Sequence, residues 1–429
     1  MSRADVVVVG GGAIGVACAF ELARAGAEVT LLEAGAALGA GCSAGSAGLL
    51  CPSHAAPLAT RAALRQGIRW SLSRDSPFAL VPRPSLLPWI ARFVAACTAE
   101  REHAATSTLR TLSVASLALH EQLAAEVGTR IARHGTLNVY QTRAGLERAA
   151  RERLDHARAG LRSEALDGGE ALALEPALIA PLAGAIYYPD ELSGDPLDFV
   201  RRLGAAAQEA GATIRCGSEV LSLRRAGRRV TGLETTEGRI DAGSCVLAAG
   251  AWSPRLARGL GLSIPVQGGK GYHLDYPAAA ADPRVPVFLR EAHVVVTPLP
   301  GRLRLAGTLA LTGLDLSVDR RRLDGIERAG AQRIRGLAGR PAVAIWRGLR
   351  PCAPDGLPIV GRPGRYDNLL LATGHAMLGF TLAPLTGRII AELARGGKPE
   401  HELALLHPDR FGSAAVPTRR GSRRAGSAR

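Results

Sequence analysis

A glycine-rich turn between two apolar runs constrains the fold of this chain more than any other stretch of its sequence. Residues 6–9 are four consecutive valines, the pattern of a strand that is buried on both faces of a parallel sheet. Gly10, Gly12 and Gly15 follow in the spacing G-x-G-x-x-G, and an alanine-rich helical stretch comes next. A second apolar run, EVTLLE, ends in Glu33. Strand, glycines, helix, strand and terminal acid in this order predict a βαβ unit that binds a dinucleotide.

Each glycine of this motif has its own physical role. Gly10 permits the tight turn, Gly12 lets backbone N–H groups approach a pyrophosphate, and Gly15 allows the helix to pack close to the strand. The partial positive charge of the helix N-terminus favours a diphosphate there. Glu33 is placed to accept hydrogen bonds from ribose hydroxyls, and its charge would repel a 2′-phosphate. The motif alone leaves open whether the unit holds an exchangeable NAD or a flavin that stays bound.

Length and composition indicate a soluble globular protein of two or three domains. The chain has 429 residues, a hydrophobic fraction of 47% and a mean hydropathy of +0.09, which provides enough apolar material for a core. No apolar run approaches the ~18–20 residues of a transmembrane helix. The first expected strand begins near Asp5, which leaves no room for a signal peptide. We therefore expect a cytoplasmic protein.

The formal net charge of +15 does not indicate a nucleic-acid partner. Only Lys270 and Lys398 are lysines, and the predominance of arginine, together with abundant alanine and glycine, indicates genomic base composition rather than a basic binding face. Residues 412–429 contain no acid and no apolar periodicity, so a basic disordered tail is expected there. We expect no nucleic-acid binding, and at most an incidental affinity for anionic membrane surfaces.

The rest of the chain alternates between two kinds of pattern. A Gly/Ser/Ala-rich loop follows the first unit, and residues 100–127 have the leucine spacing of an amphipathic helix. Further along, the pattern predicts a helix, a strand near Thr213, a second near Val220, a hairpin and an apolar strand into LAAGAW. Strand-like runs dominate from 265 to 340. The closing segment predicts a strand, a glycine turn and a helix from about Pro384.

Four sequence segments along the chain resemble those of a known family. They are the N-terminal motif, CVLAAGAWSP, GLRPCAPDGLPIVG and ATGHAMLGFTLAP. Over residues 4 to about 411 the chain resembles the D-amino-acid oxidase-like superfamily of flavoenzymes, which includes glycine oxidase, sarcosine oxidase and D-amino-acid dehydrogenase. The resemblance implies a non-covalently bound FAD whose adenosine lies on the first βαβ unit and whose flavin meets the C-terminal glycine turn. A cofactor contacted by both chain ends stays bound, which favours flavin over NAD.

The resemblance also implies an α/β fold, α+β when the whole chain is considered, with two interleaved domains. Residues 1–80, 190–262 and 341–411 are expected to form a Rossmann-type FAD-binding domain. Residues 81–189 and 263–340 are expected to form a substrate domain of mostly antiparallel sheet plus helices. The flavin domain is thus assembled from segments that are far apart in the sequence.

The resemblance places the FAD contacts in the first unit, the Gly/Ser/Ala-rich loop, the middle strands and the C-terminal turn. The expected contact residues are Gly10, Gly12, Ala13, Ile14, Gly15, Glu33, Ala34, Ser43, Ser46, Ala47, Gly48, Leu49, Val220, Ala249, Gly250, Trp252, Gly374, His375, Met377, Leu378, Gly379, Phe380 and Thr381. We expect no metal site, because the seven cysteines form no CxxC pair and no ligand spacing with histidine. Cys352, near the expected active site, offers a covalent flavin link as the alternative to non-covalent binding.

The middle of the chain most resembles the D-amino-acid dehydrogenases, and among them the dehydrogenase that acts on D-hydroxyproline. One departure is Ser46-Ala47-Gly48, where that subgroup commonly has Asn-Ala-Gly. The resemblance implies hydride transfer from Cα of a D-amino acid, D-hydroxyproline or D-proline in kind, to flavin N5, which yields an imino acid. Because no second G-x-G-x-x-G unit is found, we expect a quinone or another non-NAD acceptor. The alternatives are an oxygen-using glycine, sarcosine or D-amino-acid oxidase and a flavoprotein subunit of a hetero-oligomeric dehydrogenase.

Four residues are the candidates for chemistry on the small amino-acid substrate. Arg350, at the family's GLRP position, is expected to clamp the carboxylate with its planar guanidinium, and Arg347 is the alternative. His54 is expected to hydrogen-bond the carboxylate or a 4-hydroxyl group. Tyr272 is expected to be a second carboxylate donor or a ring beside the flavin, and His375 is expected to contact the flavin. The structural alternatives are a surface arginine, a loop histidine bonded to backbone and a packed ring.

Two further features concern the electron acceptor. Arg304 aligns with a lysine that sarcosine oxidase-like members use for oxygen, and arginine there favours a dehydrogenase. The amphipathic segment 88–98 is either a core helix or a docking patch for a membrane quinone pool or an electron-transfer partner. In the second case the protein would lie peripherally at the inner face of the cell membrane. A homo-oligomer is compatible with the sequence.

Overall fold

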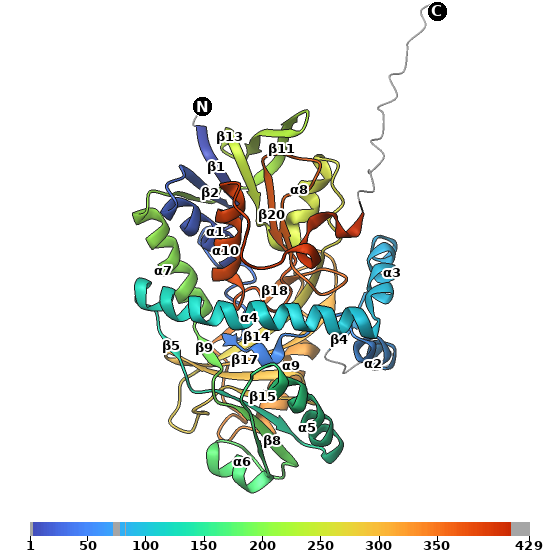
Figure 1. Cartoon of the computed structure of the whole chain (residues 1–429). Coiled ribbons are helices and arrows are strands. Elements are labelled where there is room, and N and C mark those ends of the chain that lie inside the picture. The colour runs from blue at the N-terminus through green and yellow to red at the C-terminus, as the bar shows by residue number, and fades with distance from the viewer. Residues whose placement is uncertain (1–2, 72–77, 82, 413–429) are drawn as a thin grey trace, which may run out of the picture.

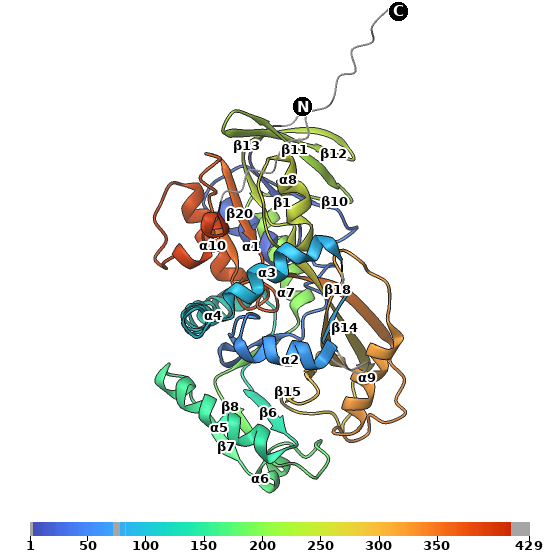
Figure 2. The same ribbon diagram turned by 90° about the vertical axis from the view of Figure 1, so that its right-hand side faces the viewer.

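Two large β-sheets with helices packed on them make up the molecule. The computed structural model describes residues 3–71, 78–81 and 83–412. The first sheet and its helices form the upper half of the molecule, and the second sheet forms the lower half (Figures 1 and 2). Of the expected basic tail, residues 413–429 lie outside the described residues. Among the described helices, none has the length and apolar character needed to cross a membrane.

The first sheet has eight strands and a parallel centre. Its parallel strands are β1 (Arg3–Val9), β2 (Val29–Glu33), β10 (Thr213–Cys216), β13 (Gly238–Leu247) and β20 (Leu369–Thr373). Its antiparallel strands are β11 (Val220–Ala226), β12 (Arg229–Thr235) and β19 (Ile359–Gly361). The parallel strands lie in the order β10-β2-β1-β13, and β20 pairs with the C-terminal part of β13. The centre of the sheet thus joins both ends of the chain.

The valines of β1 alternate between the two faces of this sheet. Val6 and Val8 belong to one apolar core, and Val7 and Val9 belong to the core on the opposite face. The helices of the first core are α1 (Ala13–Arg24), α4 (Ala99–Val127), α7 (Pro196–Glu209) and α10 (Ala383–Ala394). The second core includes residues of α8 (Ser253–Gly259). Because side chains alternate across a strand, the continuous apolar run is explained by burial on both faces.

The second sheet has nine strands, most of them antiparallel. They are β4 (Phe78–Leu80), β6 (Thr136–Tyr140), β7 (Glu164–Leu166), β8 (Gly184–Tyr188), β14 (Gln267–Pro277), β15 (Val287–Leu289), β16 (Val294–Leu299), β17 (Arg302–Leu311) and β18 (Ala344–Cys352). Eight of them follow the order β18-β14-β17-β16-β15-β6-β8-β7, and β4 pairs with β17. The helices α5 (Arg143–Arg158), α6 (Gly168–Leu174) and α9 (Arg320–Ala331) pack on this sheet.

Short elements fill the junction between the halves. β3 (Leu49–Leu50), β9 (Leu192–Gly194) and β5 (Ile131–Ala132) form a three-stranded sheet. α2 (Arg61–Ser71) and α3 (Leu87–Ala96) lie at one side of the molecule, and α4 runs across the junction (Figures 1 and 2).

The described elements match the sequence pattern closely. The helix expected over 100–127 is α4, and the strands expected near Thr213 and Val220 are β10 and β11. β18 falls within residues 341–411, which were expected to belong to the FAD-binding domain. Its nine residues belong to the second sheet, where they pair along β14. That pairing brings Arg350 to the sheet that faces the cofactor half.

Candidate active site

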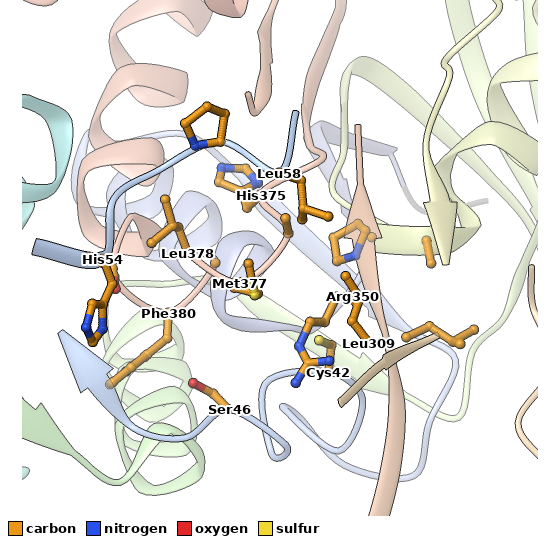
Figure 3. Close-up of a pocket in the computed structure, with 18 of the residues that line it drawn as sticks. Cys42, Ser46, His54, Leu58, Leu309, Arg350, His375, Met377, Leu378 and Phe380 are labelled. Carbon is orange, nitrogen blue, oxygen red and sulfur yellow. The ribbon is translucent and has the colours of Figure 1, made fainter. Parts of the chain in front are cut away.

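One large cavity of about 2240 Å³ lies between the two halves of the molecule. Residues of the first βαβ unit, of the loop 40–49, of β15 to β18 and of the turn after β20 line it (Figure 3). Nearly all the residues expected to contact FAD are among them, and the exceptions are Gly15, Gly48 and Gly374. Segments that are far apart in the sequence are thus brought to one cavity, which is large enough for an extended dinucleotide.

The first βαβ unit has the geometry that its glycines predict. Gly10 has φ +109°, a region that side chains disfavour. A Cβ at Gly15 would overlap the carbonyl oxygen of Gly10, so this glycine allows the close approach of α1 to the turn and does not itself line the cavity. Ser43 Oγ accepts a hydrogen bond of 2.8 Å from the N–H of Ala13. The helix N-terminus therefore faces the cavity with a polar side chain beside it, as an anionic group requires.

Glu33 lies where β2 ends. Its two carboxylate oxygens accept hydrogen bonds from the N–H groups of Gly11 (2.6 Å) and Gly35 (2.7 Å). These bonds fix the carboxylate at the cavity wall, and each oxygen has a further lone pair to offer to a ribose hydroxyl. The observed arrangement therefore fits the adenosine end of FAD.

The turn after β20 forms the other wall. Residues 377–381 all line the cavity and lead into α10. Gly374 has φ +79° and lies against Ile359 instead of the cavity. His375 is buried, and its Nε2 lies 3.1 Å from Thr386 Oγ1, while its Nδ1 has no hydrogen-bond partner in the described part of the chain. Burial lowers the pKa of His375 to about 3, so this ring is neutral and holds the turn.

Arg350 is a charged group that β18 presents to the cavity (Figure 3). Its Nη1 donates a hydrogen bond of 2.8 Å to the carbonyl oxygen of Thr308. The guanidinium lies over Gly271, where any Cβ would overlap it. Among the described residues no carboxylate pairs with it. Arg347, the alternative clamp, is exposed, donates to the carbonyl oxygen of Leu316 and does not line the cavity.

His54 ends a short 3₁₀ turn at the cavity wall. Its Nε2 lies 3.0 Å from Asn138 Oδ1, and its ring meets that of Phe288 edge-on at 5.0 Å. Burial, aided by the positive charge of Arg290, lowers the pKa of His54 to about 3. A neutral ring whose Nε2–H is donated to Asn138 leaves Nδ1 as a hydrogen-bond acceptor. His54 is therefore neutral here, and its Nδ1 can accept a hydrogen bond from an amine or a hydroxyl.

Tyr272, Lys270 and Arg304 lie on the second sheet but not at the cavity. The hydroxyl of Tyr272 donates to the carbonyl oxygen of Ser317 (3.2 Å) and accepts from the N–H of Asp319 (3.0 Å). Lys270 Nζ is buried and pairs with Asp315 at 2.8 Å. The side chain of Tyr272 thus points to the loop after β17 and away from the cavity, whereas the sequence predicted a position beside the substrate or the flavin.

Cys352 is fully buried and absent from the cavity wall, and burial raises the pKa of its thiol to about 12. Cys42 lines the cavity instead. Within the described part of the chain, no cluster of His, Cys, Asp and Glu could hold a metal ion. The geometry therefore provides no support for a covalent link at Cys352.

Glu191 is a buried acid that the sequence analysis did not identify. Its Oε1 accepts a 2.9 Å hydrogen bond from the N–H of Ser53, next to His54, and its Oε2 has no partner among the described residues. Burial raises the pKa of Glu191 to about 7, against the lowering effect of the hydrogen bonds from Ser53. The stretch YYPDELSGDP has the composition of an exposed turn, so only the neighbours that the fold brings to this carboxyl reveal it.

Sequence and fold are both similar to those of known flavoproteins. The profile of the family described as FAD dependent oxidoreductase matches residues 5–393. The chain is 39% identical over 421 residues to a D-amino acid dehydrogenase of Paramagnetospirillum magneticum, and the alignment covers 95% of this chain and 99% of that protein. It is 35% identical over 418 residues to a D-amino acid dehydrogenase of Methylobacterium nodulans, with 95% and 98% covered.

Solved structures extend the similarity to three dimensions. Glycine oxidase from Geobacillus kaustophilus superposes with a TM-score of 0.79 at 28% identity, over 96% of this chain and 99% of that one. L-proline dehydrogenase from P. horikoshii superposes with a TM-score of 0.74 over 96% and 98%, and at 21% identity this likeness concerns the fold alone.

Proposed function

The chain belongs to the family of FAD-dependent oxidoreductases and is a D-amino acid dehydrogenase-like member of it, and on this premise we propose its substrate and electron acceptor. The substrate is a D-amino acid of the D-proline or D-hydroxyproline kind, which is oxidised to the imino acid. Bound FAD supplies the acceptor for the hydride that leaves Cα. The residues of this chain bind the substrate, orient its Cα–H toward the cofactor and exclude other reactants from the site.

The position of Arg350 at the cavity is the observation that supports this proposal most directly. A guanidinium that faces the cavity and has no carboxylate partner among the described residues is suited to bind a substrate carboxylate through two charge-assisted hydrogen bonds. Fixing the carboxylate fixes the position of Cα, and such positioning is worth several powers of ten in rate. Arg350 supplies a positive charge that would compensate the carboxylate charge, which the neutral His54 does not.

The surroundings of Arg350 favour a substrate with a hydrocarbon ring. Leu58, Leu309 and Ala376 line the cavity and belong to one apolar cluster with the buried Cys352. These side chains offer no partner to a charged substrate side chain. The Nδ1 acceptor of His54, at another part of the same wall, would suit the hydroxyl of a hydroxyproline.

The experiment that tests the substrate assignment is anaerobic reduction of the bound flavin, followed as bleaching of its visible absorbance. The panel contains D- and L-amino acids, glycine, sarcosine and both hydroxyproline epimers. We expect fast bleaching by D-proline or D-hydroxyproline and slow recovery in air. Bleaching by glycine or sarcosine with fast recovery in air would identify an oxidase instead. If no substrate bleaches the flavin of the purified chain, but bleaching occurs once a partner subunit is added, the chain is a subunit of a hetero-oligomer.

The acceptor that we propose is a membrane quinone, reached by peripheral contact through α3. Leu87 and Val94 of this helix are 64% and 47% exposed, while Trp89 is buried in the core. The exposed Arg83 precedes the helix, and a basic and apolar face together suit an anionic lipid surface. We expect the protein to sediment with anionic vesicles and its Leu87→Asp/Val94→Asp variant to stay in solution; equal sedimentation of both would contradict the α3 contact.

A further inference from the structure

The loop that lines the middle of the cavity has a single free amide between residues 44 and 48. The N–H groups of Ala44 and Gly45 donate to backbone carbonyls of the same loop, as does that of Ser46. The N–H of Gly48 donates to Ser46 Oγ at 3.3 Å. The N–H of Ala47 has no partner among the described residues. An amide in this position, at the wall of a cavity, needs a partner from a ligand or from water.

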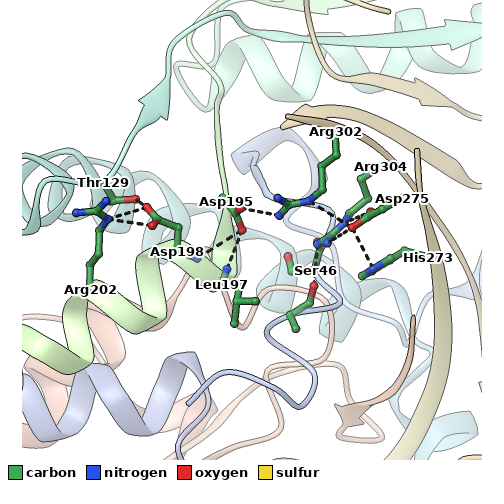
Figure 4. Close-up of polar contacts among 11 residues, drawn as sticks. Ser46, Thr129, Asp195, Leu197, Asp198, Arg202, His273, Asp275, Arg302 and Arg304 are labelled. Atoms are coloured by element: carbon green, nitrogen blue, oxygen red, sulfur yellow. Dashed lines mark hydrogen bonds and ion pairs between the residues drawn. The ribbon is translucent and has the colours of Figure 1, made fainter. Parts of the chain in front are cut away.

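Arg304 holds this loop from the opposite side (Figure 4). It is 4% exposed, and its Nη1 donates to the carbonyl oxygens of Ala44 (2.7 Å) and Ser46 (2.8 Å). Its Nε and Nη2 donate to the two carboxylate oxygens of Asp275 at 2.8 and 2.9 Å. This bidentate pair orients the guanidinium, since the planar fork matches the carboxylate.

The planarity of the peptide bond links the two observations. In a trans peptide the carbonyl oxygen and the following N–H point in opposite directions, and the bond between Ser46 and Ala47 is trans. Because the oxygen of Ser46 points to Arg304, the N–H of Ala47 points away from it. Ala47 lines the cavity and Arg304 does not, so the free N–H lies on the cavity side.

We infer that Arg304 is a positioning residue for FAD: by holding the carbonyls of Ala44 and Ser46 it keeps the Ala47 N–H available as a donor to the bound cofactor. A donor held in place stabilises the negative charge that a flavin gains on reduction. Arg304 touches neither cofactor nor substrate, and it acts through the peptide. The inference rests on the cofactor and is independent of which amino acid is the substrate.

The surroundings of Asp275 keep this clamp charged and rigid. Burial alone would raise the pKa of Asp275, but the hydrogen bonds and charge of Arg304 outweigh it and the pKa lies below its usual value. Arg302 pairs with Asp275 at 3.3 Å and also with Asp195. His273, 3.6 Å from Asp275, stacks on Trp346 and is kept neutral by burial, which lowers its pKa to about 4.

The test uses Arg304→Lys, which keeps the charge beside Asp275 but lacks both the fork that binds this carboxylate and the separate Nη1 that reaches the two carbonyls. We expect the dissociation constant of FAD, measured by titrating the apoprotein, to rise about tenfold or more, the equivalent of one lost charge-assisted interaction. If the variant loses more affinity for reduced FAD than for oxidised FAD, the midpoint potential of the bound flavin should fall. The fall is about 30 mV for each tenfold difference between the two losses of affinity. Both readouts are made without an amino-acid substrate, so they remain informative if the proposed substrate is wrong.

Arg302→Lys is the matched control. It lies on the same strand and faces the same Asp275, but it makes no contact with the loop. Because lysine keeps the positive charge beside Asp275 and Asp195, we expect this variant to leave FAD affinity and potential near those of the unmodified protein. A folded Arg304→Lys with unchanged affinity and potential would overturn the inference, as would an equal shift in Arg302→Lys. If Arg304→Lys fails to fold, Asp275→Asn, which keeps Arg304 but weakens its orientation, should show the same two shifts in smaller size, and its failure to do so would equally contradict the inference.

Discussion

Among single residues, the polar groups that lack their usual partners are those on which we base the proposed function. Arg350 faces the cavity with one hydrogen bond to a carbonyl and no carboxylate within the described residues. We expect Arg350→Leu to lower kcat/KM by about 10²- to 10⁴-fold, because two charge-assisted hydrogen bonds of about 1.5–3 kcal/mol each are lost. Steady-state kinetics with an artificial electron acceptor measure the effect.

Arg347→Leu is the control for this variant, since Arg347 lies on the same strand but outside the cavity. It should retain kcat/KM within a small factor. If the two variants lose activity equally, Arg350 acts through the charge or the stability of β18 and not as the carboxylate clamp.

Glu191 makes the free energy of unfolding of the protein depend on pH. Its folded-state pKa, about 7, lies above the ordinary 4.5 because the carboxyl is buried. The folded state therefore binds more protons than the unfolded state between these values, and stability is lost as the pH rises through this window. One unit of pKa is worth about 1.4 kcal/mol, so the loss reaches ~3 kcal/mol.

We expect Glu191→Gln to abolish this loss, because the amide is neutral at every pH. The Tm of the variant should match that of the unmodified protein near pH 5 and exceed it near pH 8. The buried histidines affect both proteins alike, so the difference in Tm between them isolates Glu191. A difference that is constant from pH 5 to pH 8 would show that this carboxyl has an ordinary pKa in the folded protein.

At the scale of elements, the βαβ unit depends on the contact between α1 and the turn after β1. A methyl group at Gly15 would overlap the carbonyl oxygen of Gly10, and the helix would have to move away from the turn at which we propose that the pyrophosphate binds. We expect Gly15→Ala to weaken FAD binding by about 100-fold or more, since overpacking costs typically 1–3 kcal/mol and the lost cofactor contacts add to it. Titration of the apoprotein with FAD measures this.

Gly325→Ala in α9 provides the comparison, because a Cβ there would meet open space. That variant should bind FAD normally and be slightly stabilised by the better helix propensity of alanine. Normal FAD binding by Gly15→Ala would mean that α1 can shift without disturbing the site.

At the scale of the whole molecule, the two halves meet around the cavity, and the cofactor should act as part of their interface. The cavity takes its lining from both sheets, and Arg302 of one half pairs with Asp195, the N-terminal cap of α7 in the other. A ligand present at about 100 times its dissociation constant stabilises the folded state by about 2.7 kcal/mol. We therefore expect FAD to raise the Tm of the apoprotein by several degrees.

ADP, which would occupy only the first βαβ unit, should raise the Tm less than FAD even when both are present at saturating concentration, because it leaves the contact with the second sheet unmade. Equal stabilisation by the two ligands would show that the flavin end contributes nothing to holding the halves together.

The parts of this protein that depend on short-range pattern could be predicted from its residues alone. The four valines of β1, the spacing of Gly10, Gly12 and Gly15 and the leucine spacing of α4 all act through neighbours within a few turns or strands. Arg350 and nearly all the FAD contacts predicted from the motif order line the cavity. In each case the local residue type dictates the local geometry.

Which of the remaining polar residues face the cavity depends on the packing of the whole chain. Tyr272 and Arg304 lie on strands that alternate between two buried faces, so a one-residue change of register would reverse their direction. β18 lies in the second sheet because it pairs with β14, and the paired residues are 69 or more positions apart, a distance over which no local pattern reveals the partner. The buried state of Glu191 and the clamp of Arg304 on Ala44 and Ser46 depend on contacts across more than 130 and 250 residues. Such contacts arise from packing of the whole chain, which is why they set pKa values and loop geometry without leaving a signal in the sequence.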